Sequence, residues 1–327
     1  MPSFVRTQEI QHIIGSTGRL ELSVSSADVQ VHAVDGDEVR VRGTFQIRAS
    51  NEEEANRIYD QIQLQVEASS HALHVRERDD RGGLASTLSR LLGGKSAELD
   101  VDVELPTGAD LRLGTVSGDV QGRGLRGEQR YTTVSGDLYL TELGGSVRLN
   151  TVSGDASVRA SVPLTVRAEA VSGDLSFSSP LLNALRSTSV SGDISLEGEL
   201  APHGEFRAET VSGDLSVGLL GSASFEVRGL STDISSHIDH RIEGRLDRRR
   251  VVIGSGEPVF IFNSMSGDLS IRRPGRVQRW AGTRQEGTPP PQPSADEQLA
   301  ILQALERGEI DVDEATRRLG GEGATDA

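Results

Sequence analysis

The stretch Val116–Asp119, which reads VSGD, decides the fold because it recurs along the chain. Perfect copies occupy 116–119, 134–137, 152–155, 171–174, 190–193 and 211–214. A seventh copy, Met265–Asp268, has Met in place of Val, and a degenerate eighth, Leu230–Asp233, reads LSTD. The aspartates of these copies follow one another at steps of 18, 18, 19, 19, 21, 19 and 35 residues. Such self-similarity is typical of repeat proteins, in which each unit stacks on its neighbours.

The sequence on both sides of each copy alternates between apolar and polar residues. After the aspartate, the first and third residues are mostly apolar, as in Leu175 and Phe177. Before the tetrapeptide, apolar residues recur at two-residue steps, as in Leu111 and Leu113. A period of two is the period of a β-strand. Each unit is therefore predicted to be a strand, a Ser-Gly-Asp corner, a second strand and a turn. The long last step predicts a further unit within 234–264 that has lost its signature.

Stacking of these units explains the corner residues. One coil cannot bury its apolar face alone, whereas stacked coils align like residues into columns with about 4.8 Å between rungs. We expect the valine before each Ser-Gly-Asp, and the residue after each Asp, to form such aliphatic columns in the interior. Glycine permits a backbone conformation that other residues avoid, and Ser and Asp side chains can bond the N–H groups at the corner. The sequence thus predicts an all-β fold, a parallel β-solenoid (β-helix) of 18–21-residue coils.

The remaining segments are organised around this solenoid. Residues 1–110 are predicted to be an N-terminal β region with one short helix, capping the repeat solenoid at 111–273. Within that region Val24–Asp28 (VSSAD) reads as a diverged earlier copy, and Asn51 reads as the N-cap of the helix. A Pro-rich linker at 274–293 precedes a small C-terminal helical hairpin at 294–320 and a disordered tail at 321–327. The hairpin is too small to hold a core alone, so we expect it to self-associate or to dock on a partner.

Composition and charge exclude several classes of protein. The chain has 34 Lys and Arg against 49 Asp and Glu, a formal net charge of −15, which argues against nucleic-acid binding. It has no Cys, which excludes disulfides, thiol catalysis and Cys-ligated metal sites. No apolar run is long enough to predict a transmembrane helix, and residues 1–14 do not read as a secretory signal. We therefore expect a cytoplasmic protein, located beside a membrane only through a partner.

The aspartates of the perfect copies are the sharpest candidate site. A row of carboxylates can bind Ca²⁺ or a basic partner, because hard cations prefer oxygen ligands. Calcium-binding β-roll repeats, however, have a period of about nine residues, and the steps in this chain are about twice as long. The favoured interpretation is that each carboxylate caps the corner by accepting hydrogen bonds from backbone N–H groups. The residues are Asp119, Asp137, Asp155, Asp174, Asp193 and Asp214.

Carbohydrate chemistry is the next candidate. Glycoside hydrolysis needs two carboxyl groups set apart on one face, usually with aromatic side chains that stack on sugar rings. Trp280 lies in the linker, and the chain has three tyrosines, Tyr59, Tyr131 and Tyr139. No sugar platform is visible in this pattern.

Histidine and arginine groups give weaker signals. His203, His237 and His240 fall in no recognisable motif, and exposed loop histidines are favoured over a metal pair formed by the last two. The run Arg248–Arg250 reads as a solvated face or as internal ion pairs, although it could contact an acidic partner. No phosphate loop or dinucleotide fingerprint is present. The sequence therefore predicts no catalytic, cofactor-binding or metal-binding residues.

The Ser-Gly-Asp coils that follow an N-terminal β region resemble an adhesin-like bacterial family of domains of unknown function, over about residues 10–273. The stretch 301–319 (ILQALERGEIDVDEATRRL) is similar to short SHOCT-like helical modules, with a Leu-rich helix, a Gly-x-Ile turn and an acidic start to a second helix. The resemblance implies no enzymatic activity. It also implies a link to envelope-stress systems and oligomerisation through the short module.

The sequence thus favours a non-catalytic scaffold or interaction protein. Its partner is another protein or a second copy of itself, bound through 294–320, so we expect a homo-oligomer. One alternative is a carbohydrate-binding or carbohydrate-active β-helix protein. A further alternative is a surface adhesin stabilised by cations.

Overall fold

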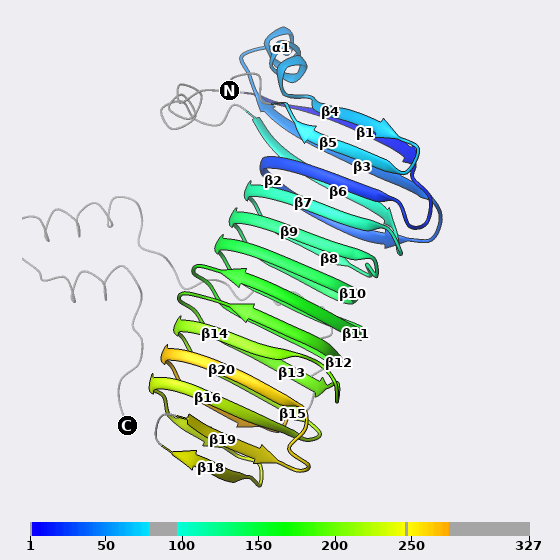
Figure 1. Ribbon diagram of the computed structural model, residues 1–327. Coiled ribbons are helices and arrows are strands. Elements are labelled where there is room, and N and C mark those ends of the chain that lie inside the picture. Colours follow the sequence, from blue (N-terminus) through cyan, green and yellow to red (C-terminus); the bar gives the residue numbers. More distant parts are fainter. Residues whose placement is uncertain (1, 79–96, 246–247, 275–327) are drawn as a thin grey trace, which may run out of the picture. The chain divides into compact units, whose positions relative to one another are not determined.

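Strands of the protein lie one above another in the computed structural model shown in Figure 1. The structure describes residues 2–78, 97–245 and 248–274, which all belong to one of the chain's two units, Met1–Arg276. These residues are nearly all in β-strands, as predicted. The predicted hairpin at 294–320, and the linker and tail beside it, lie outside the described residues apart from Pro274.

The N-terminal part combines antiparallel and parallel pairs. β1 (Ser3–Ile13) pairs antiparallel with β3 (Glu38–Arg48), which pairs antiparallel with β6 (Ala97–Pro106). β4 (Leu64–Ser69) and β5 (Ala72–Glu77) form an antiparallel hairpin. β2 (Arg19–Val34) is longer and pairs in parallel with β5, β6 and the first repeat strands. β2 therefore makes the first full rung of the stack.

The predicted short helix is present as α1 (Glu52–Ile62). The Asn51 side chain accepts a hydrogen bond from the backbone N–H of Glu54 at 2.9 Å, which confirms the predicted N-cap. Ala55 is buried, and the ring of Tyr59 meets the ring of Phe45 edge-on at 5.3 Å. α1 thus packs its apolar side against the β1–β3 sheet.

Each repeat supplies one strand before the Ser-Gly-Asp corner and one after it, and each kind of strand forms its own parallel ladder. Three long strands, β10 (Leu138–Ser153), β11 (Ala156–Ala170) and β12 (Leu175–Thr188), take part in both ladders. The other strands before a corner are β7 (Asp110–Ser117), β9 (Glu128–Ser135), β14 (Phe206–Ser212), β20 (Val259–Ser266) and β16 (Ala223–Ser231). The other strands after a corner are β8 (Val120–Arg123), β13 (Ile194–Leu200), β15 (Leu215–Leu220), β21 (Leu269–Arg272) and β17 (Ile234–Ser236).

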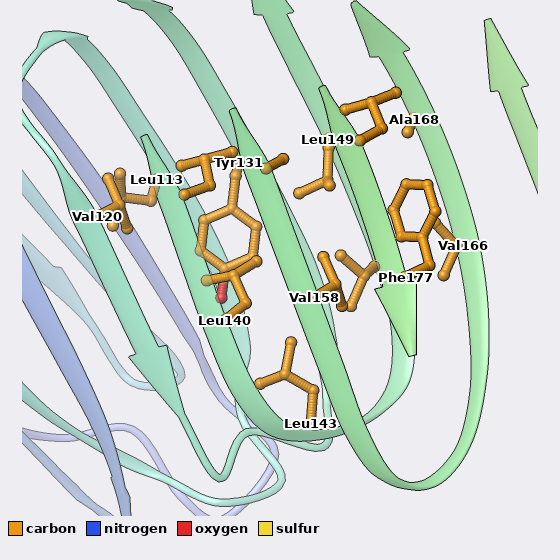
Figure 2. Packing of buried hydrophobic residues seen from close by; sticks show 14 of the residues in the cluster. Leu113, Val120, Tyr131, Leu140, Leu143, Leu149, Val158, Val166, Ala168 and Phe177 are labelled. Carbon is orange, nitrogen blue, oxygen red and sulfur yellow. The ribbon is translucent and has the colours of Figure 1, made fainter. Parts of the chain in front are cut away.

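The core lies between the two ladders. Figure 2 shows side chains from both sets, such as Leu149 and Val158, in the space between the ribbons. The residue after the Asp is at most 2% exposed in the six perfect copies and in the Met265–Asp268 copy, which confirms the predicted interior column; Ile234, after the degenerate copy, is only partly buried. The members of the column are Val120, Leu138, Ala156, Leu175, Ile194, Leu215 and Leu269.

The valine of the tetrapeptide lies on the opposite side, so the predicted interior valine column is wrong. In β7 the side chains of Leu111, Leu113 and Thr115 are buried, whereas Val116 is 53% exposed. Side chains alternate across a strand, so a buried Thr115 sends its neighbour outward. The buried hydroxyl of Thr115 donates a hydrogen bond to the Ser117 carbonyl at 3.2 Å, which makes its burial tolerable.

The last rungs do not follow the order of the sequence. β20 and β21 insert between the β14–β15 rung and the β16–β17 rung, pairing in parallel with both. The segment predicted to hold a lost repeat instead contains β18 (Arg241–Arg245) and β19 (Arg248–Ile253), which pair antiparallel. β19 also pairs antiparallel with β16, so it covers the edge of the last parallel rung. The expectation of a further coil within 234–264 is therefore wrong.

Candidate functional site

The predicted aspartates form a continuous hydrogen-bonded column along the corners. From the second Asp of the column onward, each backbone N–H donates to Oδ1 of the Asp on the preceding rung, at 2.7–3.0 Å. In spatial order the column is Asp28, Asp119, Asp137, Asp155, Asp174, Asp193, Asp214, Asp268 and Asp233. This confirms the corner-capping interpretation, and it confirms that Val24–Asp28 occupies a repeat corner.

The glycine beside each Asp allows the rungs to approach closely. Gly173 has φ +113°, and a Cβ placed there would collide with the carbonyl oxygen of Gly154 on the preceding rung. Both the backbone angle and the contact require glycine. The corner is thus a structural device, and across the described ranges no group of three or more His, Asp or Glu side chains is placed to hold a metal ion.

The outward valines form a second column beside the corners, here called the valine column. Its side chains are 45–56% exposed at every rung from β7 to β20. Its members are Val116, Val134, Val152, Val171, Val190, Val211 and Met265. The stack therefore presents a continuous line of apolar side chains to the outside.

A third column, of arginines, was missed by the sequence analysis. An arginine precedes the valine of every perfect tetrapeptide by four residues, so the repeat reads R-x-x-x-V-S-G-D. That constant offset is the signal that could have revealed it. Strand register places these residues side by side on successive rungs. The arginine column consists of Arg112, Arg130, Arg148, Arg167, Arg186 and Arg207.

Carboxylates balance only part of the arginine column. Arg167 pairs with Glu169 at 2.8 Å, and Arg207 pairs with Glu209 at 2.6 Å. The pKa of Glu209 lies below its usual value, mainly because Arg207 donates a hydrogen bond to its carboxylate. A hydrogen bond from Asn263 and the positive charge of Arg186 lower this pKa further, whereas burial raises it. Each glutamate stands two residues after its arginine, on the same face of the strand.

The first half of the column has no such partners. Gly114, Thr132 and Asn150 occupy the equivalent positions after the first three arginines. Within the described part of the chain, no salt bridge or side-chain hydrogen bond joins these arginines to another group, and the Nε of Arg148 is buried without a hydrogen-bond partner. The three consecutive unpaired residues are Arg112, Arg130 and Arg148, here called the arginine triplet. Arg186 has no such bond among the described residues either, but it lies between the rungs of Arg167 and Arg207, which carry glutamate partners.

The tyrosines do not form a sugar platform. Tyr131 is fully buried, and its hydroxyl donates to the Gln129 side-chain oxygen at 3.3 Å; burial raises the pKa of this tyrosine. Tyr139 is 46% exposed, and its hydroxyl donates to Asp137 at 3.0 Å. Tyr59 packs on Phe45, and Trp280 lies outside the described residues.

The histidines and the arginine run are not brought together into a site. His203, His237 and His240 are exposed, and Nδ1 of His240 lies 2.9 Å from the carbonyl oxygen of Ile238. Arg249 donates to the Thr232 carbonyl, and Arg250 donates to the Ser224 hydroxyl at 2.9 Å. These two arginines therefore donate hydrogen bonds to neutral oxygen atoms within the protein.

Two hollows lie in the N-terminal part. One, of about 370 Å³, is lined by β1, β3 and β6, where Arg42 pairs with Glu9 at 3.0 Å and Arg40 with Glu104 at 3.5 Å. The other, of about 260 Å³, lies beside Asp100, whose pKa is raised first by burial and then by neighbouring carboxylates. The first hollow thus contains two ion pairs, and the second is lined by the carboxylates of Asp28, Glu98 and Asp100, of which Glu98 pairs with Arg48 at 3.4 Å.

Comparison with known proteins finds one matching family model and several solved structures. A family model described as Toastrack DUF4097 matches residues 17–272. Three solved structures each match 82% of this chain: a candidate cell adhesion protein from Clostridium sporogenes (9% identity, 100% of that chain, TM-score 0.22), a candidate adhesin from Bacteroides fragilis (10%, 97%, 0.35) and a candidate lipid-binding protein from Parabacteroides distasonis (14%, 97%, 0.30). With TM-scores this low, these likenesses support no inference about function. No curated protein matches.

None of the helical structure in the described ranges has the length and hydrophobicity that crossing a membrane requires.

Proposed function

We propose that this chain, which belongs to the Toastrack DUF4097 family, is a non-catalytic scaffold that presents a face of its stacked strands to a protein partner. The observation that carries the proposal is the valine column, whose side chains are 45–56% exposed on every rung from β7 to β20. Contiguous exposed apolar surface on a soluble fold is typical of interaction sites. Seven side chains at about 4.8 Å per rung make a line of roughly 29 Å.

The stack is suited to repeated contacts. Each rung is tied to the next by backbone pairing and by the aspartate column, so the valines keep a constant spacing. A partner that contacts several rungs at once gains avidity from many weak contacts. A protein segment that lies along the stack is therefore the expected ligand of the valine column.

Residues 294–320 complete the proposal as an oligomerisation or docking module. Its support is the capping-box and leucine pattern of the sequence, with Leu299, Leu302 and Leu305 on one side. We propose that it makes the protein a homo-oligomer, in the cytoplasm, with a role in the response to envelope stress. Light scattering of the full chain carrying Leu302→Asp and Leu305→Asp tests the module, because charged residues on an oligomer interface should yield monomers.

The valine column is tested by three substitutions in the full chain, Val152→Ser, Val171→Ser and Val190→Ser. Because these side chains are about half exposed, the melting temperature should stay close to that of the wild type. The triple valine variant should no longer recover the proteins that the wild type recovers from native lysate. The matched control carries Ser157→Ala, Ser176→Ala and Ser195→Ala, on the strands after the corner, and should recover the same proteins. Equal recovery by all three proteins would contradict the proposal.

The carbohydrate alternative has less support. Sugar rings stack on exposed aromatic faces; Tyr131 of β9 is fully buried, and Tyr139 of β10 is the one exposed aromatic side chain among the described residues. The cation-stabilised alternative is weakened because one carboxylate oxygen of each aspartate of the perfect copies already accepts a hydrogen bond from a backbone N–H.

A further inference from the structure

The arginine triplet is the feature that the scaffold proposal leaves unexplained. Register pairs Arg112 with Arg130 and Arg130 with Arg148, on neighbouring strands of a parallel ladder. Like charges that lie directly opposite on paired strands destabilise a sheet. The chain has a net charge of −15 and 49 acidic residues, so carboxylates to balance the triplet are plentiful in composition. Two later rungs do supply one, at Glu169 and Glu209.

The geometry of the triplet defines the ligand that would balance it. Guanidinium groups bind phosphate and carboxylate oxygens through two parallel hydrogen bonds. The three groups are spaced at about 4.8 Å per rung along a straight line. A ligand that satisfies all of them must be a chain with at least one anionic group per rung.

The surroundings of the triplet suit a slender chain with many oxygens. Thr132 and Asn150, two residues further along the strands, carry neutral donor groups on the same face. Gly114 leaves the first rung open, since a Cβ there would meet only the Ser23 hydroxyl, at 3.9 Å. Carboxylates border the triplet at both ends, since Glu21 lies opposite Arg112 and Glu169 lies opposite Asn150. Asp110 and Glu128 stand two residues before Arg112 and Arg130 on the same face, so an anionic chain is confined to the line of the guanidinium groups.

Other polyanions fit this line less well. Acidic side chains on one face of an extended peptide recur only every ~6.7 Å, which is too sparse to meet every rung. Single-stranded nucleic acids are held by aromatic stacking platforms, and the positions beside the triplet are Gly, Thr and Asn. An anionic bilayer is a plane, so it would also face the exposed aspartate corners. Condensed phosphates, whose neighbouring phosphoryl groups share a bridging oxygen, offer an anion to every guanidinium.

We propose that Arg112, Arg130 and Arg148 form a binding site for a condensed phosphate chain, inorganic polyphosphate, which lies along the stack. The site is independent of the scaffold proposal. The arginine and valine columns are four residues apart on each strand and can be changed separately.

The test measures binding of inorganic polyphosphate to the full chain at low ionic strength, by calorimetry and by thermal shift. Polyphosphate should raise the melting temperature of the wild type, because a ligand of the native state stabilises it. The double variant Arg130→Gln, Arg148→Gln should bind at least ~10-fold more weakly, since two charge-assisted contacts are lost, and its affinity should fall less steeply with salt. The control Arg126→Gln, Arg159→Gln makes the same charge change outside the column and should bind within about twofold of the wild type.

Two further variants keep the result interpretable. Without ligand, the double variant should melt no lower than the wild type, because it removes like charges that face each other. Arg130→Lys with Arg148→Lys keeps the charge but loses the two-pronged geometry, and should bind with intermediate affinity. The valine-to-serine variant of the scaffold test should bind polyphosphate like the wild type, so the two proposals can fail separately.

Several results would overturn the site. One is that polyphosphate does not bind the wild type. Another is that the double variant and its control lose affinity equally, because binding would then reflect net charge alone. A third is that polyglutamate, oligo-dT, polygalacturonate or phosphatidylglycerol vesicles bind the wild type as tightly as polyphosphate at equal charge concentration.

Discussion

Val190 and Ile194 are four residues apart and chemically alike, yet they lie on opposite sides of the wall of strands. Val190 is 49% exposed and Ile194 is fully buried. The corner between them, Ser-Gly-Asp, turns the chain from one ladder into the other. Residue type alone therefore does not tell which side an aliphatic residue faces; the alternation set by the preceding strand does.

This contrast predicts that truncating Ile194 to alanine lowers the free energy of unfolding much more than truncating Val190 does. Ile194→Ala should lower the free energy of unfolding by about 2–5 kcal/mol, since it leaves a cavity in the core. Val190→Ala should change it by less than about 0.5 kcal/mol, as is usual for surface positions. Urea denaturation of both variants checks this. Similar losses for the two would mean that the valine column is buried in solution.

The aspartate column predicts that hydrogen bonding matters more than charge. Asp155 Oδ1 accepts the backbone N–H of Asp174 at 2.8 Å. Asp155→Ala should cost about 0.5–2 kcal/mol, by analogy with the loss of a helix cap. Asp155→Asn keeps an oxygen acceptor and should cost much less. Thermal denaturation separates the two, and an equal loss for Asn would point to the charge as the stabilising feature.

The positive φ and the close contact of the corner glycines predict that an added Cβ destabilises the fold. Gly173→Ala should destabilise by more than about 1 kcal/mol, because φ is +113° and the new Cβ collides with Gly154. Gly114→Ala is the control, since it has no positive φ and an open position. It should be neutral, or stabilising by up to about 1 kcal/mol. If both variants unfold alike under urea denaturation, the close approach of the rungs is not a constraint.

At the scale of elements, the last rungs show how pairing choices depart from chain order. β20 lies between β14 and β16 with parallel partners on both sides, whereas β18 pairs only with β19 among the described strands. An antiparallel hairpin covers β16, and no described strand pairs with the second edge of β18. Edge strands expose unpaired backbone groups and open more readily.

Hydrogen exchange should follow this difference. Amides of β20 (Val259–Ser266) should be protected for far longer than those of β18 (Arg241–Arg245), because their opening requires disruption of the stack. Exchange monitored by mass spectrometry, with peptides covering each strand, checks it. Equal protection would mean that a further strand pairs with β18 in solution.

At the scale of the whole molecule, the stack behaves as a series of nearly equivalent rungs. Deleting residues 156–174 removes one complete 19-residue period, from one aspartate to the next. The shortened chain should keep its β circular-dichroism spectrum and a cooperative melt, with lower stability, because repeat proteins depend on nearest-neighbour interfaces. Deleting 156–164 breaks the register and should abolish folding. Loss of structure in the first deletion would mean that the rungs are not interchangeable.

Much of the candidate site was readable from local pattern. The aspartate caps followed from the chemistry of a Ser-Gly-Asp corner, and the interior column after each Asp followed from period-two alternation. The arginine column was also available, because Arg186 and its equivalents precede the valine by a constant four residues. It was missed because a charged residue on an outer face normally reads as solvated surface. Its meaning depends on register, which places six like charges in one line.

The recurring unit, its two strands and its corner were determined by the sequence alone, because strand period, glycine freedom and side-chain capping act within a few residues of one another. The outward direction of the valines also follows from that alternation, whereas only the tertiary structure decided that β20 and β21 enter between two earlier segments and that β18 and β19 form a hairpin instead of another coil. Those outcomes depend on which strands far apart in the chain pair with each other. That choice is made by packing across the whole stack and leaves no local pattern to read.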